Sequence, residues 1–156
     1  MYLQLKPVSL YLADGIKKFN KVADLVVIEG PKAGGHLGFK VDEISEKQDN
    51  YDNDIKEIIA CVKDFEESTG KKIPVVFAGG VFDRKDIDHC FELGLDGVQM
   101  ATRFVATEEC DADVAFKQAY VDAKPGDAVI VKSPVGMPGR ALNNNLLPIL
   151  YHRVVK

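Results

Sequence analysis

The sequence predicts an α/β protein with buried parallel strands, and three observations lead to that prediction. Two continuous apolar runs, ADLVVI (23–28) and IPVVFA (73–78), have the pattern of strands that are covered on both faces. Between them stands DIKEIIACVKDFEESTG (54–70), whose apolar residues fall on one face of a helix. This alternation of buried strands with amphipathic helices is typical of parallel sheets built from strand–helix–strand units.

The first half of the chain is expected to begin with a strand. From the N-terminus we predict a strand over 3–10, a short amphipathic helix over 12–21, a strand over 23–30, a polar and acidic stretch over 39–54, and a helix over 54–70. Gly70 is expected to end that helix, because glycine readily adopts the left-handed conformation of a helix C-terminus.

The second half continues the alternation. We predict a buried strand over 73–80, a short helix over 83–94, a third buried strand over 96–104, a helix over 110–124 and a strand-like run over 127–133. The sequence contains no low-complexity segment and no linker that would divide it. Residues 1–156 are therefore expected to form one domain.

Composition and charge exclude several classes of protein. The net charge of −4 gives no electrostatic reason to expect nucleic acid or an anionic membrane as a partner. No apolar run approaches the ~20 residues of a membrane span, and the N-terminus lacks the layout of a signal peptide, so we expect a cytoplasmic protein. The three cysteines, Cys61, Cys90 and Cys110, follow no metal-ligand spacing and are expected to be free thiols.

Small-residue loops follow the carboxyl ends of three predicted strands. They are EGPKAGGHLG (29–38), AGGVFD (78–83) and ATRF (101–104). That end of the strands carries the ligand site in open α/β sheets and in βα barrels, and backbone N–H groups in such loops can bind phosphate. The glycine pair AGG by itself fits a tight structural turn equally well, but two such loops at successive strands resemble the phosphate cup of barrel enzymes.

Three segments, EGPKAGGHLGF, VVFAGGVFDRKDIDHCFELGLDGVQMATRFVATEEC and SPVGMPGRALNN, together resemble the nitronate monooxygenase (2-nitropropane dioxygenase) family. Its relatives include the FMN-dependent enoyl-acyl-carrier-protein reductases of type II. The match covers about 23–144, and 145–156 is a divergent tail. The resemblance implies a partial barrel domain, the C-terminal portion of an FMN-binding TIM (β/α)8 barrel whose first strands are missing.

The resemblance also implies the site. His36 matches the family histidine beside the flavin, which acts as base or proton donor toward substrate; a histidine that bonds loop carbonyls is the structural alternative. Thr102 and backbone amides would hold the FMN phosphate. Gln99 also fits a buried amide between strands. Ala101 stands where the family usually has glycine, and its methyl group either crowds the phosphate or is tolerated because φ is negative. The implied cofactor-binding residues are Gly34, Gly35, Gly79, Gly80, Gln99, Met100, Ala101 and Thr102.

Other polar residues are expected to be structural, and no metal site is expected. His89 is interpreted as a surface or helix-end histidine, and Arg103 as the partner of an acid behind its strand. The acidic run lacks EF-hand spacing and is interpreted as a solvated face. Residues 133–140 either pack over the site, as in the family, or form a plain connecting loop. The acidic run comprises Asp42, Glu43, Glu46, Asp49, Asp52 and Asp54.

The leading functional hypothesis is an FMN flavoprotein that oxidises alkyl nitronates with dioxygen to a carbonyl compound and nitrite. The alternative within the same fold is an NAD(P)H-dependent enoyl-acyl-carrier-protein reductase. A different alternative is a non-catalytic barrel fragment, or a subunit that completes a partner chain. Because a partial barrel leaves strand edges and apolar surface open, self-association or binding of a completing chain is expected.

Overall fold

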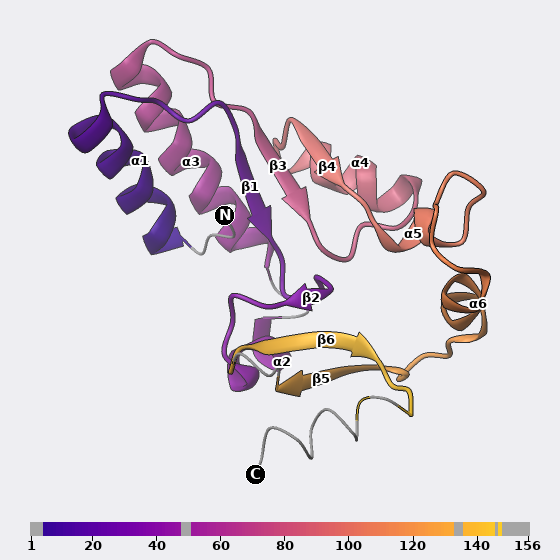
Figure 1. Ribbon diagram of the computed structural model, residues 1–156. Coiled ribbons are helices and arrows are strands. Elements are labelled where there is room, and N and C mark those ends of the chain that lie inside the picture. The colour runs from indigo at the N-terminus through magenta and orange to yellow at the C-terminus, as the bar shows by residue number, and fades with distance from the viewer. Residues whose placement is uncertain (1–4, 48–50, 133–135, 146, 148–156) are drawn as a thin grey trace.

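The computed structural model describes residues 5–47, 51–132, 136–145 and 147 (Figure 1). The elements in chain order are α1 (Leu5–Phe19), β1 (Val26–Glu29), β2 (Gly35–His36), α2 (Val41–Lys47), α3 (Asp52–Thr69), β3 (Val75–Ala78), α4 (Arg84–Glu92), β4 (Gly97–Gln99), α5 (Thr102–Val105), α6 (Val114–Asp122), β5 (Ala128–Lys132) and β6 (Pro138–Leu142).

Three strands form the parallel sheet that the sequence predicts. Its order is β1-β3-β4, and its register aligns Glu29 with Ala78 and Ala78 with Gln99. Asp96 fixes the start of β4, because its carboxylate accepts a hydrogen bond from the Val75 amide at 2.9 Å while its own amide donates to the Val75 carbonyl at 2.8 Å. The carboxyl ends of all three strands therefore lie at one edge of the sheet.

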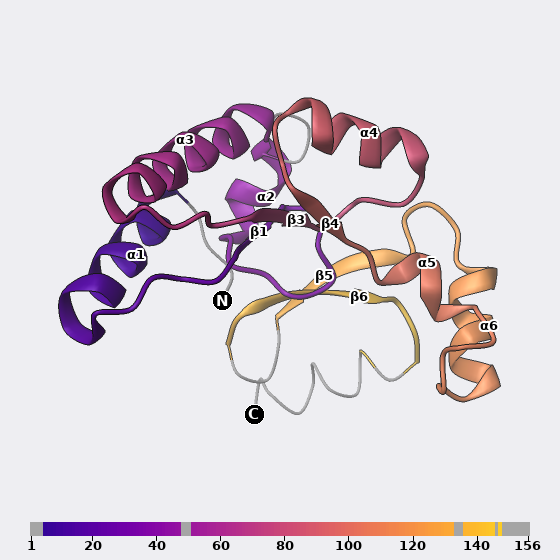
Figure 2. The same ribbon diagram turned by 90° about the horizontal axis from the view of Figure 1, so that it is seen from above.

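Helices α1, α3 and α4 lie along one side of this sheet (Figure 2). The core forms where the apolar face of α3, including Ile58 and Val62, meets Ile28 of β1 and Val8 and Leu12 of α1. As predicted, α3 ends at Gly70, which has a φ of 67° and donates its amide hydrogen to the carbonyl of Glu66. This arrangement is one layer of helices on a parallel sheet, as in the outer ring of a βα barrel.

The strand predicted over 3–10 is wrong in its described part, because residues 5–10 belong to α1. Val8 and Leu12 are spaced by four residues and both are buried, whereas Leu10 is exposed, which is the pattern of a helix face rather than a strand. Pro7 does not prevent the helix, since it falls in the first turn, where backbone N–H groups have no intrahelical partner.

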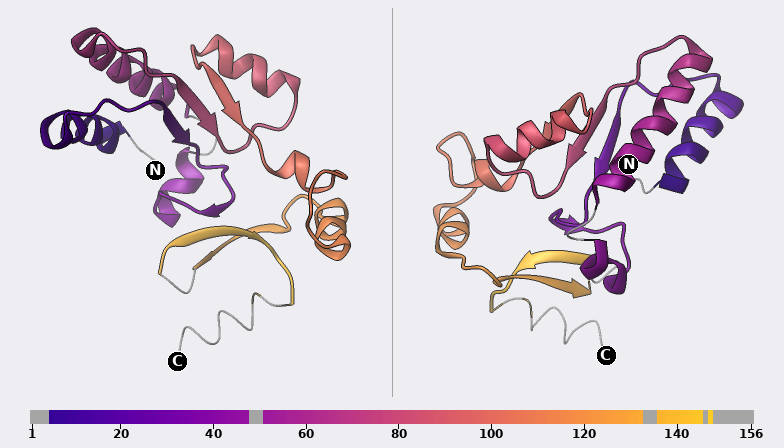
Figure 3. Two further views of the ribbon diagram at one scale, coloured as in Figure 1. Left: turned by 45° about the horizontal axis from the view of Figure 1, so that its top comes forward. Right: turned by 180° about the vertical axis from the view of Figure 1, so that it is seen from behind.

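The last strand-like run does not join the parallel sheet. Residues 128–132 form β5, which pairs antiparallel with β6, and β6 also pairs antiparallel with β2. The part of 133–140 that the structure describes is therefore not a plain connecting loop, since Pro138–Arg140 belongs to a strand. Figure 1 shows this second sheet beneath the carboxyl ends of β1 and β3, and Figure 3 shows that α5 and α6 connect it to β4.

The third predicted strand is shorter and less buried than expected. Strand β4 spans Gly97–Gln99, and Thr102 begins the short helix α5. Gln99 is exposed, because β4 has one strand neighbour among the described residues, β3. All three cysteines are free, as predicted. Within the described ranges, the helices are too short or too polar to cross a membrane.

Candidate functional site

A cavity of about 430 Å³ lies at the carboxyl ends of the parallel strands. This volume is within the range of small-molecule binding pockets. The wall consists of the last residues of β1, β3 and β4, the loops that follow them, part of α5, and one residue of α6, Tyr120. The lining residues are Glu29, Lys32, Ala33, Gly34, Gly35, Ala78, Gly79, Gly80, Val81, Phe82, Gln99, Met100, Ala101, Thr102, Val105 and Tyr120.

All eight residues that the sequence suggests for cofactor binding line this one cavity. They come from three separate loops, and the parallel register brings those loops together at the same edge of the sheet. The suggested catalytic residue, His36, is not among the lining residues, although its neighbour Gly35 is. The arrangement is that of several short backbone segments converging on a concave surface.

Gly79 and Gly80 adopt a conformation that other residues rarely adopt. Their φ angles are 103° and 88°, in the region where a Cβ is strained. A Cβ on Gly79 would also lie 2.8 Å from the amide nitrogen of Ala33, so the loop after β1 lies directly against the loop after β3. Within the described residues, neither glycine amide takes part in a backbone hydrogen bond, which leaves both N–H groups available to a ligand.

Arg140 holds the loop after β1 in place. Its Nη1 donates hydrogen bonds to the carbonyl oxygens of Pro31, at 2.8 Å, and Ala33, at 2.9 Å. The amide of Ala33 donates to the Gly30 carbonyl at 3.1 Å, and that of Gly30 to the Ala78 carbonyl at 2.8 Å. The second sheet thus fixes the position of the glycine loop, a role for Arg140 that sequence reasoning missed.

The loop after β4 carries an alanine where the family usually has glycine. Ala101 has a φ of −125°, which is outside the left-handed region that favours glycine. Among the residues that the structure describes, Arg103 pairs with no acid, contrary to expectation. Its guanidinium lies 4.9 Å from the centre of the Phe82 ring, a cation–π contact. That contact joins the loops after β3 and β4 at the cavity wall.

His36 lies beside the cavity on the surface. It is exposed and belongs to β2, where it is paired with Gly139 of β6. The next residue, Leu37, is buried and donates its amide hydrogen to the Pro138 carbonyl at 2.9 Å. The backbone around the histidine is therefore fixed by strand pairing, while its side chain is exposed.

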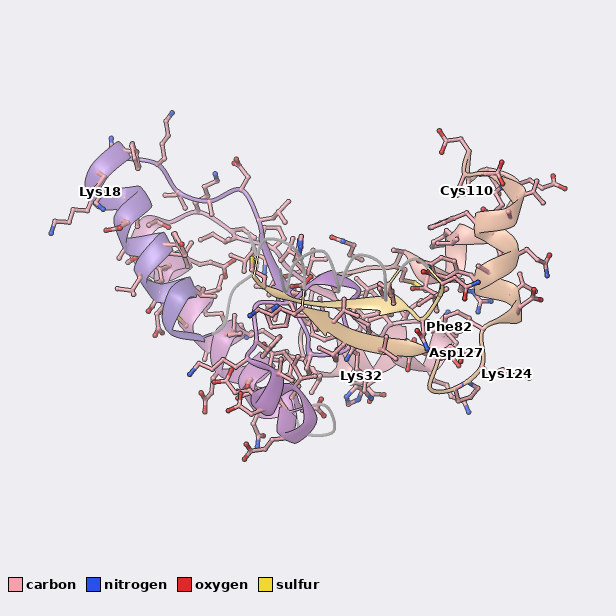
Figure 4. The ribbon with its side chains drawn as sticks, turned by 60° about the horizontal axis from the view of Figure 1, so that its bottom comes forward. Lys18, Lys32, Phe82, Cys110, Lys124 and Asp127 are labelled. Carbon is pink, nitrogen blue, oxygen red and sulfur yellow. The ribbon has the colours of Figure 1, made fainter. Side chains whose placement is uncertain are left out.

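Two charged residues of the cavity were missed by sequence reasoning, Glu29 and Lys32. Glu29 ends β1 and is 6% exposed, and burial raises the pKa of its carboxyl group from the usual 4.5 to about 7. The sequence feature that indicates Glu29 is a charged residue placed directly after a buried apolar run. Figure 4 shows Lys32 near the middle of the molecule and Phe82 closer to the end that carries Cys110, with Lys18 at the opposite end.

The remaining polar candidates take structural positions. His89 of α4 lies with its Nε2 3.1 Å from an oxygen of Asp52 at the start of α3, and Asp54 pairs with Lys47 at 2.5 Å. Asp49 and the tail histidine, His152, lie outside the described residues. In the described part of the chain, no group of three or more His, Cys, Asp or Glu side chains could hold a metal ion.

The architecture and the cavity define a class of protein, the TIM-barrel enzymes. The chain superimposes on FabK from Thermotoga maritima with a TM-score of 0.70 and 26% identity, over 97% of this chain and 41% of that one. It superimposes on nitroalkane oxidase from Streptomyces ansochromogenes with a TM-score of 0.68 and 25% identity, over 93% of this chain and 38% of that one. Both are TIM-barrel enzymes, and this chain corresponds to the C-terminal portion of such a barrel.

The family follows from the sequence match. A sequence model described as nitronate monooxygenase matches residues 9–155, and the chain belongs to this enzyme family. Probable nitronate monooxygenases of Staphylococcus haemolyticus and Staphylococcus saprophyticus are 34% and 30% identical to it, each over 80% of this chain. The chain spans about a third (33%) of the length of these curated relatives.

Proposed function

We propose that this chain supplies the phosphate-binding end of an FMN site in an oxidoreductase that oxidises alkyl nitronates with dioxygen, giving a carbonyl compound and nitrite. One observation carries the proposal: three glycine- and alanine-rich loops converge on one cavity of about 430 Å³. Membership of the nitronate monooxygenase family supports the reaction class.

The residues of the cavity fit a phosphate-bearing group. Gly79 and Gly80 have no side chain that would fill the space in front of their unused N–H groups, which is what close approach of a phosphate requires. The Thr102 hydroxyl and the Lys32 ammonium belong to residues of the same wall and are suited to an anion. Bound there, FMN would supply electron transfer between nitronate and dioxygen.

The side chains of this chain have separate roles in the proposal. Gly34 and Gly35 leave room for a flat ligand, and Gln99 presents an amide at the end of β4. His36 takes a proton from the substrate, or returns one to it, at an imidazole nitrogen, since imidazole exchanges protons near neutral pH. Strand pairing with Gly139 fixes the backbone of His36 next to Gly35, which lines the cavity.

Binding and turnover can be tested on the same sample. We expect the purified chain to quench FMN fluorescence on titration, and to release nitrite from an alkyl nitronate with consumption of dioxygen. Gly80→Val should weaken FMN binding, because a branched side chain blocks approach to the backbone and resists a φ of 88°. Gly38→Ala is the matched control, since a Cβ there meets no atom within 4 Å and Gly38 does not line the cavity.

Other outcomes of these binding and turnover assays would favour the alternative functions. Rapid NAD(P)H consumption with an enoyl thioester, without nitrite formation, would favour the reductase. FMN binding without either activity would favour a non-catalytic chain that completes a partner. If FMN binds the Gly80→Val and Gly38→Ala variants equally well, the phosphate lies elsewhere.

A further inference from the structure

A second cavity, of about 500 Å³, lies between α6 and the antiparallel sheet. Apolar side chains form much of its wall, among them Phe116 of α6 and Leu142 of β6. Gly35 and Tyr120 line this cavity and also the cavity of the glycine loops. The two cavities therefore adjoin, and a molecule bound in the second would lie next to a cofactor bound in the first.

Arg140 is the one cation among the described residues that line this second cavity. Its Nη1 donates to the carbonyl oxygens of Pro31 and Ala33. Arginine also carries N–H donors on Nε and Nη2, and within the described ranges neither of these has a hydrogen-bond partner. Because a half-buried cation is unfavourable unless its donors are satisfied, the unused donors indicate a place for an anionic ligand.

Strand geometry places the Arg140 side chain on the side of this cavity. Arg140 and Leu142 are two residues apart on β6 and therefore project from the same face of the sheet, and Leu142 also lines the cavity. Gly35 is the partner of Arg140 in the strand register, and a Cβ on Gly35 would meet no atom within 4 Å. There is thus open space beside the cross-strand neighbour of the arginine.

Two acids line the same cavity, and both have local partners. One carboxylate oxygen of Asp127 accepts a hydrogen bond from the Lys124 amide at 2.7 Å, and one of Asp122 accepts from the side-chain amide of Gln118 at 2.8 Å. Burial lowers the pKa of the Arg140 guanidinium, and neither acid offsets that effect. An anion is therefore favoured in this cavity only where it contacts the guanidinium directly.

We propose that Arg140 binds the two oxygens of the substrate's nitronate group in this second cavity, next to the cofactor cavity. The inference rests on the proposed function, because it takes an alkyl nitronate as the substrate. A nitronate group is planar and carries its negative charge on two oxygens, as a carboxylate does, and the planar fork of arginine binds such a pair of oxygens through two N–H groups. The apolar wall that includes Phe116 and Leu142 suits the alkyl part.

Two small molecules test the charge recognition without FMN or turnover. Isobutyrate and 2-nitropropane share a branched alkyl group and a planar end with two oxygens, but at pH 7 only isobutyrate is an anion. Ligand-observed NMR gives both dissociation constants. We expect wild type to bind isobutyrate at least about tenfold more tightly than 2-nitropropane, and Arg140→Gln to lose this preference, since a hydrogen bond to a charged group contributes at least about that factor. Equal affinities in wild type would contradict the proposal.

A second pair of variants leaves Arg140 and its bonds to the loop after β1 in place. Ala119 and Val121 are both exposed residues of α6, but only Ala119 lines the cavity. Ala119→Trp should fill the cavity and weaken isobutyrate binding at least about tenfold, whereas Val121→Trp should not change it. Isobutyrate binding that survives in Ala119→Trp would place the anion elsewhere and overturn the proposal.

FMN titration of the same samples separates this inference from the proposed function. If wild type binds FMN but not isobutyrate, the role of Arg140 is overturned while the proposed function stands. If it binds isobutyrate but not FMN, the proposed function fails and the anion-binding role of Arg140 stands. In protein that turns over, the KM for propane-2-nitronate should rise in Ala119→Trp and not in Val121→Trp; an unchanged KM in both would show that the substrate does not occupy this cavity.

Discussion

The guanidinium group of Arg140 is hydrogen-bonded to the carbonyl oxygen of Ala33 at 2.9 Å, across 107 residues of sequence. Ala33 in turn lies against Gly79, since a Cβ on that glycine would come within 2.8 Å of the Ala33 amide nitrogen. The antiparallel sheet, the loop after β1 and the loop after β3 are therefore mechanically connected. Substitutions in the antiparallel sheet should therefore shift the loops that line the cavity.

Arg140→Met should weaken both folding and FMN binding. The change removes two hydrogen bonds from a half-buried cation to the carbonyls of Pro31 and Ala33, and hydrogen bonds to charged groups contribute about 1.5–3 kcal/mol each. We expect the free energy of unfolding, from urea titration, to fall by about 3 kcal/mol, the lower end of that range for two bonds, and the FMN dissociation constant to rise. Arg84→Met is the control, because Arg84 is exposed and its ion pair, with Asp88, lies on the surface of α4. Equal losses in both variants would contradict the role of Arg140.

Gly79→Ala should destabilise the chain more than Gly38→Ala. At Gly79 the φ of 103° is strained for alanine, and the new Cβ meets the backbone of Ala33. A left-handed non-glycine residue costs of order 1–3 kcal/mol, whereas Gly38 has open space around it. The comparison is made by thermal unfolding of the two variants, and equal melting temperatures would show that the loops can separate freely.

His36→Ala should slow turnover while leaving FMN binding nearly intact. The residue lies beside the cavity and does not line it, and loss of a general base typically lowers the rate ~10²–10⁴-fold. Because the side chain is exposed, stability should change little. Nitrite release at saturating nitronate is the measurement, with fluorescence titration for binding. Full activity in this variant would contradict a catalytic role for His36 and favour a histidine that only bonds loop carbonyls.

Glu29 should make the wild-type protein less stable as the pH rises from 4.5 to 7. The folded-state pKa is raised to about 7, so folding favours the neutral acid, and this stabilisation is complete below the unfolded pKa and lost as the pH passes the folded one. A shift of 2.5 pKa units corresponds to about 3 kcal/mol. Urea titrations of wild type and Glu29→Gln across this interval should diverge by up to that amount, and parallel curves would show that Glu29 titrates normally.

Self-association of the chain is expected at micromolar concentration. Several large apolar side chains are exposed near β4 and α6, and β4 has one neighbouring strand among the described residues, which favours pairing with another chain. The exposed side chains are Phe82, Phe104, Val114 and Phe116. Light scattering measures the molar mass, and a monodisperse species of 17.2 kDa with one tightly bound FMN would rule the expectation out.

The sequence by itself determined the parallel unit of the fold and eight residues of the cavity wall. Continuous apolar runs can only be buried strands or helices, and the glycine-rich segments that follow them mark the ends of β1 and β3. The local sequence pattern was therefore sufficient to predict these two strands. The motifs at 29–39 and 75–104 also led to the nitronate monooxygenase family, which the family match confirms. The roles of His36 and the eight cavity residues stay predictions.

Tertiary structure alone decided the rest, because the deciding contacts join residues far apart in the chain. Residues 5–10 alternate enough to suggest a strand, yet Val8 and Leu12 are buried against α3, and packing outweighs local preference. Nothing local indicates that Pro138–Leu142 pairs with Gly35–His36, or that Arg140 reaches Pro31. Glu29 is polar in sequence, and only its burial in the folded chain, where it is 6% exposed, raises its pKa.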